Sequence, residues 1–117
     1  MDNYNYLYKT VQKYVSTYQF LPKDNVPYPF AVINNTNYDF TEVKTTGYFN
    51  TLKRENYQVD FYYSSKKMSE LKKTINNILE ILQPKINMNK TNVDIILDDS
   101  TDELLWHGIL EVEFYGS

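Results

Sequence analysis

His107 is the only histidine of the chain, so acid–base chemistry by an imidazole at neutral pH would depend on it. A histidine acting as a general base needs a nucleophile and an orienting acid nearby. Glu111 and Glu113 share its face of a predicted strand, but there is no nucleophile motif of the G-x-S-x-G type and no cysteine. The sequence therefore favours a packing or hydrogen-bonding role for His107 beside Trp106 over an enzymatic one, and predicts no catalytic residue.

The densest group of carboxylates lies in one predicted turn, formed by Asp98, Asp99, Asp102 and Glu103. Oxygen ligands of this kind suit a hard cation such as Ca²⁺, but the turn lacks the glycine and the spacing of an EF-hand loop. Aspartate and serine are also common in turns, because their side chains hydrogen-bond to the nearby backbone. We therefore expect a solvated or interface turn, with no bound metal and no other cofactor.

Motifs for other ligand classes are absent from the sequence. Gly47, Gly108 and Gly116 stand alone, so neither G-x-G-x-x-G nor a Walker motif is present and nucleotide binding is not expected. The chain has one arginine and no basic run longer than two residues, which argues against general nucleic-acid binding. No apolar run is long enough to span a membrane.

Charge is separated along the chain in a way that bears on self-association. Residues 1–90 hold all twelve Lys and Arg with eight acids, whereas residues 91–117 hold seven acids and no Lys or Arg. Such a chain can attract copies of itself head to tail, unless interleaved strands cancel the separation in space. The twelve tyrosines suit surfaces that become buried in assembly, although an A/T-rich genome explains the same count.

Two amphipathic helices are predicted from the spacing of apolar residues. In residues 2–18, apolar and tyrosine side chains recur every three or four positions, with Asp2 as the N-cap. A second helix is expected from about 67 to 82, capped by Ser64 or Ser65. Their apolar faces are wide enough to pack on a sheet.

The remaining pattern predicts strands at 30–33, 38–45, 55–63, 92–98 and 104–115. The stretch Thr45–Arg54 is polar and is expected to be a long hairpin loop. These elements predict a single α+β domain over residues 1–117. It has one antiparallel-rich sheet of four to five strands, two helices packed on that sheet, and the order α-β-β-β-α-β-β.

One segment resembles a known protein family, Pro27-Tyr28-Pro29-Phe30-Ala31-Val32-Ile33. A Pro-Tyr-Pro-Phe segment that opens a short apolar strand after an N-terminal helix is similar to the tail terminator, or tail-completion, proteins of long-tailed bacteriophages. The later order of elements and the total length also resemble them. The chain departs from the family at Tyr62 and Tyr63, where those proteins often have Trp.

The resemblance implies a virion protein of the tail or neck, assembled in the host cytoplasm. Such proteins form a ring, typically a hexamer, that stops polymerisation of the tail tube and offers the surface for head-tail joining. The implied partners are other copies of the chain, the major tail tube protein and the head-tail connector protein. DNA passes through the ring without specific binding, which a predominantly acidic lumen would favour.

The expected assembly contacts come from the polar hairpin and the acidic turn, at Tyr48, Phe49, Lys53, Arg54, Asp98, Asp99, Asp102 and Glu103. We expect one of these two regions to lie at the lumen or at the tube-facing surface. Three alternatives stay open: a head-tail connector or other neck protein, a small non-enzymatic protein-binding module, and an enzyme that uses His107 with Glu111 or Glu113.

Overall fold

The computed structural model describes residues 2–34, 38–45, 48–100 and 103–115, and for 38–45 and 48–54 it describes the backbone alone. Its elements follow the order α1 (Asn3–Gln12), β1 (Ser16–Tyr18), β2 (Phe30–Ile33), β3 (Tyr38–Thr45), β4 (Tyr48–Ser64), α2 (Met68–Leu82), β5 (Asn92–Asp98) and β6 (Leu105–Phe114). Two short 3₁₀ turns, Gln83–Lys85 and Met88–Lys90, connect α2 to β5.

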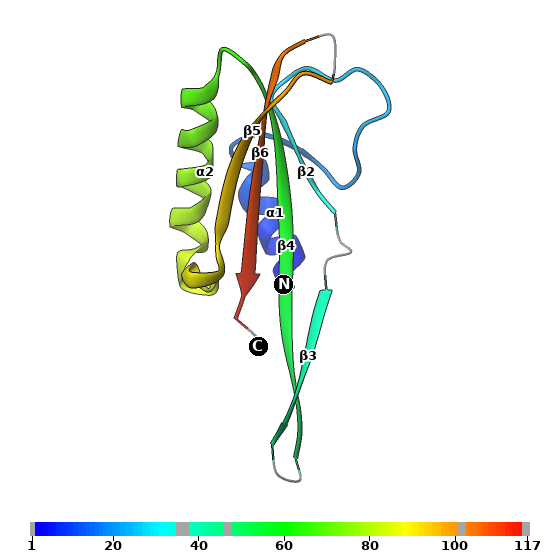
Figure 1. Ribbon diagram of the computed structural model, residues 1–117, viewed down its shortest axis with the longest axis vertical. Coiled ribbons are helices and arrows are strands. Elements are labelled where there is room, and N and C mark those ends of the chain that lie inside the picture. Colours follow the sequence, from blue (N-terminus) through cyan, green and yellow to red (C-terminus); the bar gives the residue numbers. More distant parts are fainter. Residues whose placement is uncertain (1, 35–37, 46–47, 101–102, 116–117) are drawn as a thin grey trace.

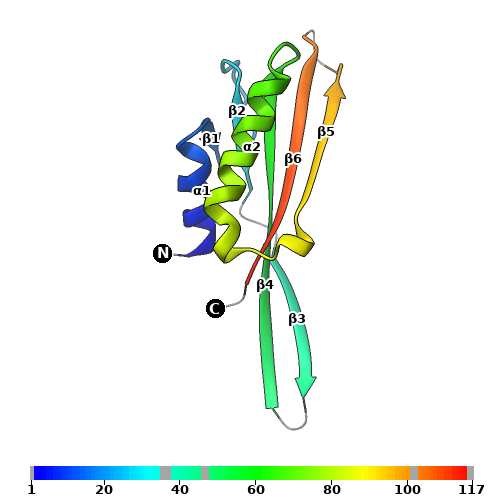
Figure 2. The same ribbon diagram turned by 90° about the vertical axis from the view of Figure 1, so that its left-hand side faces the viewer.

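The strands form one sheet in the order β1-β2-β4-β6-β5, and β3 pairs with β4 outside that path. Both helices lie on the same face of the sheet (Figures 1 and 2), which confirms the predicted α+β class. The sheet is mixed, because β1 runs parallel to β2 while the other described pairs are antiparallel.

The core lies between the helices and the face of the sheet that they cover, which we call the inner face. In β4 the alternate residues Tyr57, Val59, Phe61 and Tyr63 point into it, opposite Val112, Leu110, Gly108 and Trp106 of β6. The helices pack against these residues through Leu7 and Val11 of α1 and through Leu71 and Ile78 of α2. The apolar residues of both strands fall on this one side because successive side chains of a strand alternate between its two faces.

The first helix is shorter than predicted. Asp2 caps it as expected, its carboxylate accepting a hydrogen bond from the backbone N–H of Asn5 at 2.8 Å. The helix ends at Gln12, so the prediction for residues 13–18 was wrong. Residues Ser16–Tyr18 instead form β1 along β2, because pairing with an existing strand satisfies the backbone and suits the β-branched Thr17 better than a helix does.

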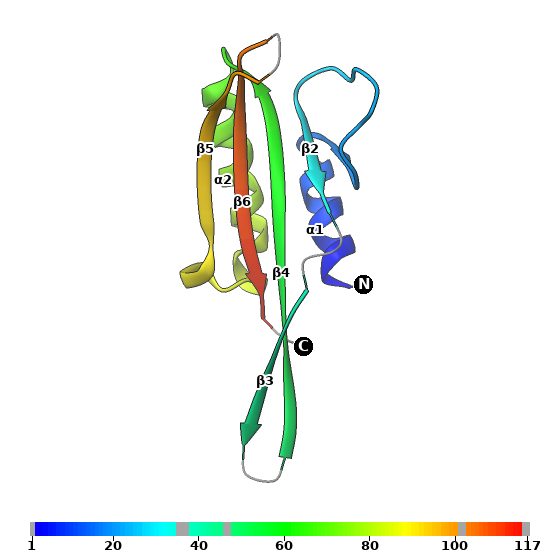
Figure 3. The ribbon, with the colours of Figure 1, turned by 45° about the vertical axis from the view of Figure 1, so that its right-hand side comes forward.

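The stretch Thr45–Arg54 was wrongly predicted to be a loop. β4 begins at Tyr48 and runs unbroken for 17 residues, and β3 pairs with it from Tyr38↔Glu55 to Thr45↔Tyr48. Only residues from Glu55 onward pair with β6. The hairpin of β3 and Tyr48–Arg54, here named the arm, therefore projects beyond the rest of the sheet (Figures 1 and 3). The ladder of hydrogen bonds between two strands is made by the backbone, so a polar sequence can form it.

The second helix and the terminal hairpin of β5 and β6 lie where the sequence placed them. The predicted cap was wrong, because Lys67 occupies the N-cap position of α2 and its side chain makes no capping hydrogen bond. The carbonyl of Ser64 accepts from the backbone N–H of Lys67 at 2.9 Å, and the carbonyl of Ser65 accepts from Trp106 Nε1 at 2.8 Å. The two serines thus connect β4 to α2 and to β6.

Candidate functional site

Four rings form a row on the face of the sheet opposite the helices, which we call the outer face. Phe30 of β2, Tyr62 of β4 and His107 of β6 are register neighbours across three strands. Tyr62 stacks on Phe30 with ring centroids 5.0 Å apart and on His107 at 4.6 Å, and Tyr28 extends the row by stacking on Phe30 at 5.6 Å. Within this aromatic row the rings cover one another's faces, and Phe30 is buried.

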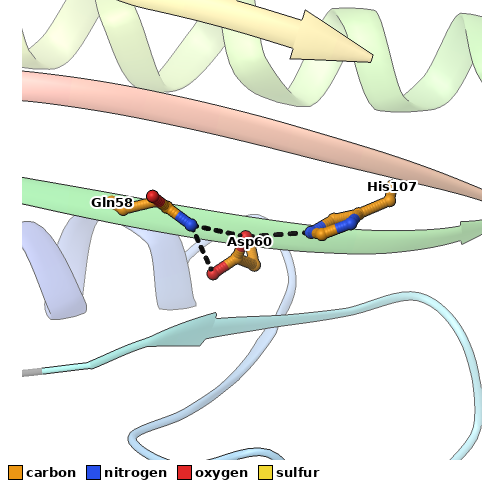
Figure 4. A network of polar contacts seen from close by, with 3 residues as sticks. All are labelled: Gln58, Asp60 and His107. Carbon is orange, nitrogen blue, oxygen red and sulfur yellow. Dashed lines mark hydrogen bonds and ion pairs between the residues drawn. The ribbon is translucent and has the colours of Figure 1, made fainter. Parts of the chain in front are cut away.

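His107 is held by a carboxylate that the sequence did not single out. Its Nε2 lies 2.9 Å from Asp60 Oδ1, and Gln58 Nε2 donates to both oxygens of Asp60 at 3.0 and 3.3 Å (Figure 4). The partner of His107 is Asp60, and not Glu111 or Glu113, which only the enzyme alternative had paired with it. Asp60 lies on the same face of β4 as Gln58 and Tyr62, and Tyr62 pairs with His107 across the strands. The contact between Asp60 and His107 therefore depends on the register of β4 and β6, which the sequence alone does not give.

The Asp60–His107 pair orients an imidazole but does not by itself make a reaction centre. Asp60 is the one hydrogen-bond partner of His107 among the described residues. Both side chains are about one fifth exposed, so the pair sits at the sheet surface. The hydrogen bond to Asp60 fixes the ring plane of His107 against Tyr62. This orientation is explained by packing of the aromatic row alone and does not require a catalytic role.

Tyr62 sits in the middle of the aromatic row and is difficult to ionise. Its pKa is raised above the ordinary value, first because burial disfavours the phenolate and then because the charges of Asp60 and Asp98 repel it. The tyrosine therefore stays neutral through the physiological range. It can offer a neutral hydroxyl, but it cannot act as a base there.

A cavity of about 790 Å³ opens beside the aromatic row, between the outer face and the segment that joins β1 to β2. Its lining residues are Leu21, Pro22, Lys23, Asp24, Asn25, Val26, Pro27, Tyr28, Phe30, Tyr62, Asp98, Ser100, Glu103 and Leu105. Three are carboxylates and one is a lysine, so the cavity is acidic as well as aromatic. Its volume lies in the range of sites that receive side chains or small ligands.

The structure brings part of the predicted acidic turn into this cavity. Asp98 and Glu103 line it, Asp99 does not, and Asp102 lies outside the described residues. Asp98 accepts hydrogen bonds from the Ser100 hydroxyl at 2.6 Å and from the Ser100 backbone N–H at 2.9 Å. These bonds, in that order, lower the pKa of Asp98, and His107 adds a smaller effect in the same direction. Asp98 therefore carries a fixed negative charge at the cavity.

The other predicted contact residues belong to the arm, far from the acidic turn. The backbones of Tyr48, Phe49, Lys53 and Arg54 pair with Thr45, Lys44, Phe40 and Asp39 of β3, and their side chains lie outside what the structure describes. The acidic turn is at the opposite end of the sheet (Figure 1). The two predicted contact regions are therefore separate surfaces and do not form one site.

Most residues that line the cavity, among them Asp24, Tyr28 and Tyr62, were not predicted from the sequence as site residues. Prolines at 22, 27 and 29 stiffen the segment that contains Asp24 and Tyr28. These prolines are the feature of the sequence from which a rigid connection could have been predicted. Among the described residues, no three His, Asp or Glu side chains gather in a way that could hold a metal ion.

Comparison with known proteins assigns no family to the chain, since no family model and no curated protein matches it. In the described part of the chain, neither helix has the length and apolar character needed to cross a lipid bilayer.

Proposed function

We propose that this protein is a structural subunit of a bacteriophage tail. Copies of it form a ring that closes the end of the tail tube, stops tube polymerisation and provides the surface for head-tail joining. The observation that carries the proposal is the arm, which extends the sheet well beyond the part that the helices cover (Figure 2).

A two-stranded hairpin of this kind is marginally stable alone in water. Within the described strands, β3 pairs with β4 only, and β4 residues before Glu55 pair with β3 only. Both edges of the arm are thus open to further strand pairing. A hairpin that is ordered mainly by contacts with a neighbour suits a subunit whose final form exists in an assembly, and suits an isolated enzyme or monomeric module less well.

The distribution of charge supports repeated head-to-tail contacts. The outer face exposes Asp94 and Glu111 from the acidic C-terminal part, while the helical layer on the other side exposes lysines such as Lys9 and Lys72. Interleaving of strands therefore does not cancel the separation seen along the chain. Faces of opposite charge favour a heterologous contact, which closes into a ring when the rotation between copies allows it.

The resemblance of the Pro27–Ile33 segment to tail terminator proteins supplies the biological setting. In the structure this segment leads into β2, which follows α1 and β1 and precedes the arm. An acidic outer face and acidic turn would repel DNA phosphates if they faced the channel of the ring, so DNA would pass without being held.

The experiment is to remove the protein from a phage that encodes it and to examine the particles by electron microscopy. Overlong tails, or tails without heads, are expected, and the wild-type chain supplied in trans should restore normal particles. A variant with the arm shortened to a tight turn between Phe40 and Lys53 should fail to restore them. Asn76→Ala, an exposed substitution on α2, is the matched control and should restore them fully.

Normal tails in the absence of the protein, or absence of the protein from purified virions, would contradict the proposal. Particles with normal tails that fail only in attachment to heads would instead indicate a head-tail connector or another neck protein.

A further inference from the structure

The cavity beside the aromatic row has the chemistry of a receptor for a cationic side chain. Its sheet wall is made of the rings of Phe30 and Tyr62, and Tyr28 stands at its edge. Three carboxylates, Asp24, Asp98 and Glu103, lie around these rings, against one lysine. The carboxylates attract an alkylammonium or guanidinium group, while the rings and prolines accept its aliphatic stem.

Groups with that chemistry lie on and just before α2, the helix that packs on the other face of the sheet. Four exposed lysines, Lys66, Lys67, Lys72 and Lys73, surround the first turns of α2. Of these four lysines, only Lys67 has an ion-pair partner within the part of the chain that the structure describes, and that partner is Glu70 at 3.4 Å. Cations at a helix N-terminus are disfavoured by the helix dipole, so this placement does not serve the stability of α2 itself.

The two surfaces face away from each other. α2 forms one side of the molecule, and the segment between β1 and β2 that covers the cavity forms the other (Figures 1 and 2). Because the sheet separates α2 from the cavity, Lys72 and Lys73 of one copy cannot fill its own cavity, but those of a neighbour placed side by side can. Lys66 and Lys67 precede α2, at the end of the sheet that also holds the acidic turn. Such a contact joins the cavity of one copy to the lysines of the next. The lysines of the first copy and the cavity of the second stay free, so the same contact can be repeated with further copies.

We propose that the cavity of each copy binds Lys72 and Lys73 of a second copy of this chain, and that this contact joins neighbouring subunits. This inference rests on the proposed ring function and names the surface through which the ring closes. The lysine stems lie against Pro22 and Pro27, and the ammonium groups meet Asp24 and Asp98. Charge complementarity between the acidic cavity and the lysines at the start of α2 is the reason for choosing a copy of the same chain as the occupant.

The test uses two neutralised variants of the full-length protein. The helix variant is Lys72→Gln with Lys73→Gln, and the cavity variant is Asp24→Asn with Asp98→Asn. In sedimentation velocity at concentrations up to about 1 mM, the wild type should form assemblies larger than a dimer. Each variant alone should associate at least about tenfold more weakly, a change of roughly 1.4 kcal/mol. Circular dichroism and urea unfolding establish that both variants remain folded.

Mixing the two variants gives the decisive measurement. The intact lysines of the cavity variant fit the intact cavity of the helix variant, so the mixture should form heterodimers and nothing larger. Carbodiimide cross-linking, with one partner labelled with ¹⁵N, should join Lys72 or Lys73 of one copy to a cavity carboxylate of the other. Lys9→Gln with Lys13→Gln, and Asp94→Asn with Glu111→Gln, change the charge equally at other exposed positions and should leave assembly unchanged.

A wild type that stays monomeric at about 1 mM overturns the inference, as do variants that assemble like the wild type or a mixture that forms no heterodimer. Failure of this contact is distinguishable from failure of the proposed function. Defective tails in phage lacking the protein, together with fully assembling variants, would refute only the docking surface. Normal tails together with the expected heterodimers would refute only the tail function.

Discussion

The two faces of the sheet are built from the same strands but have different roles: the inner face forms the core, and the outer face carries the aromatic row and the cavity. On the inner face, α1 and α2 exclude water from alternate residues of β4 and β6. On the outer face, the residues between them form the aromatic row, the Asp60–His107 pair and the wall of the acidic cavity. Because successive side chains of a strand point to opposite faces, a single strand supplies both stability and a recognition surface.

The comparison is sharpest at two adjacent residues of β4. Phe61 points inward and is fully buried in the core, while Tyr62 points outward between Phe30 and His107. The two rings are nearly equal in size, so any difference in the effect of removing them reports the face and not the side chain.

The largest expected effect is that of Phe61→Ala, which should lower the free energy of unfolding by about 3–5 kcal/mol, since it leaves a cavity in the core. Tyr62→Ala should cost about 1–2 kcal/mol, mostly the lost stacking on its two neighbours. Urea unfolding followed by circular dichroism measures both. Equal costs for the two substitutions would show that the outer face is as much a part of the folding core as the inner face.

The same comparison explains which features the sequence made predictable. The inner faces of β4 and β6 followed from strict alternation, as at Val59 and Leu110, because burial of one face demands it. Helix α2 followed from its apolar stripe. These features depend on local periodicity, and the structure confirms them.

The features that escaped prediction depend on partners distant in the chain. β1 exists because β2, some 14 residues later, runs beside it, as Ser16↔Phe30 shows. The first part of β4 is a strand because β3 pairs with it, although its polar sequence resembles a loop. Asp24 and Asp98 line the same cavity although they are far apart in the sequence, and no local sequence pattern predicts that they lie near each other.

The second prediction concerns a buried hydrogen bond between a strand and a helix on the inner face. Tyr63 Oη and Thr74 Oγ1 are 2.9 Å apart, and both residues are buried. Thr74→Val keeps the shape of the side chain but leaves the tyrosine hydroxyl without this partner, so we expect a loss of about 1–3 kcal/mol.

A double-mutant cycle with Tyr63→Phe separates this bond from packing. When both hydroxyls are absent no polar group is left unpaired, so the double variant should be more stable than the two single losses would predict by addition. Strict additivity in urea unfolding would mean that the two hydroxyls are satisfied independently, and that the inner face tolerates polar groups as readily as the outer face does.

The smallest expected effect lies at the outer end of the sheet, where Asp98 faces solvent. The Ser100 hydroxyl and then its backbone N–H lower the pKa of Asp98, so this carboxylate is more acidic in the folded chain than in the unfolded one. Its contribution to stability is therefore present above the unfolded-state pKa of about 3.9 and is lost as the pH falls through the folded-state pKa. Ser100→Ala removes the stronger of the two donors, and the pKa of Asp98 should rise toward its ordinary value. Titration of the side-chain carboxyl ¹³C resonance by NMR measures the change, with Ser69→Ala on α2 as the control. An unchanged titration in Ser100→Ala would mean that the negative charge of the outer face is set by the surface as a whole and not by this turn.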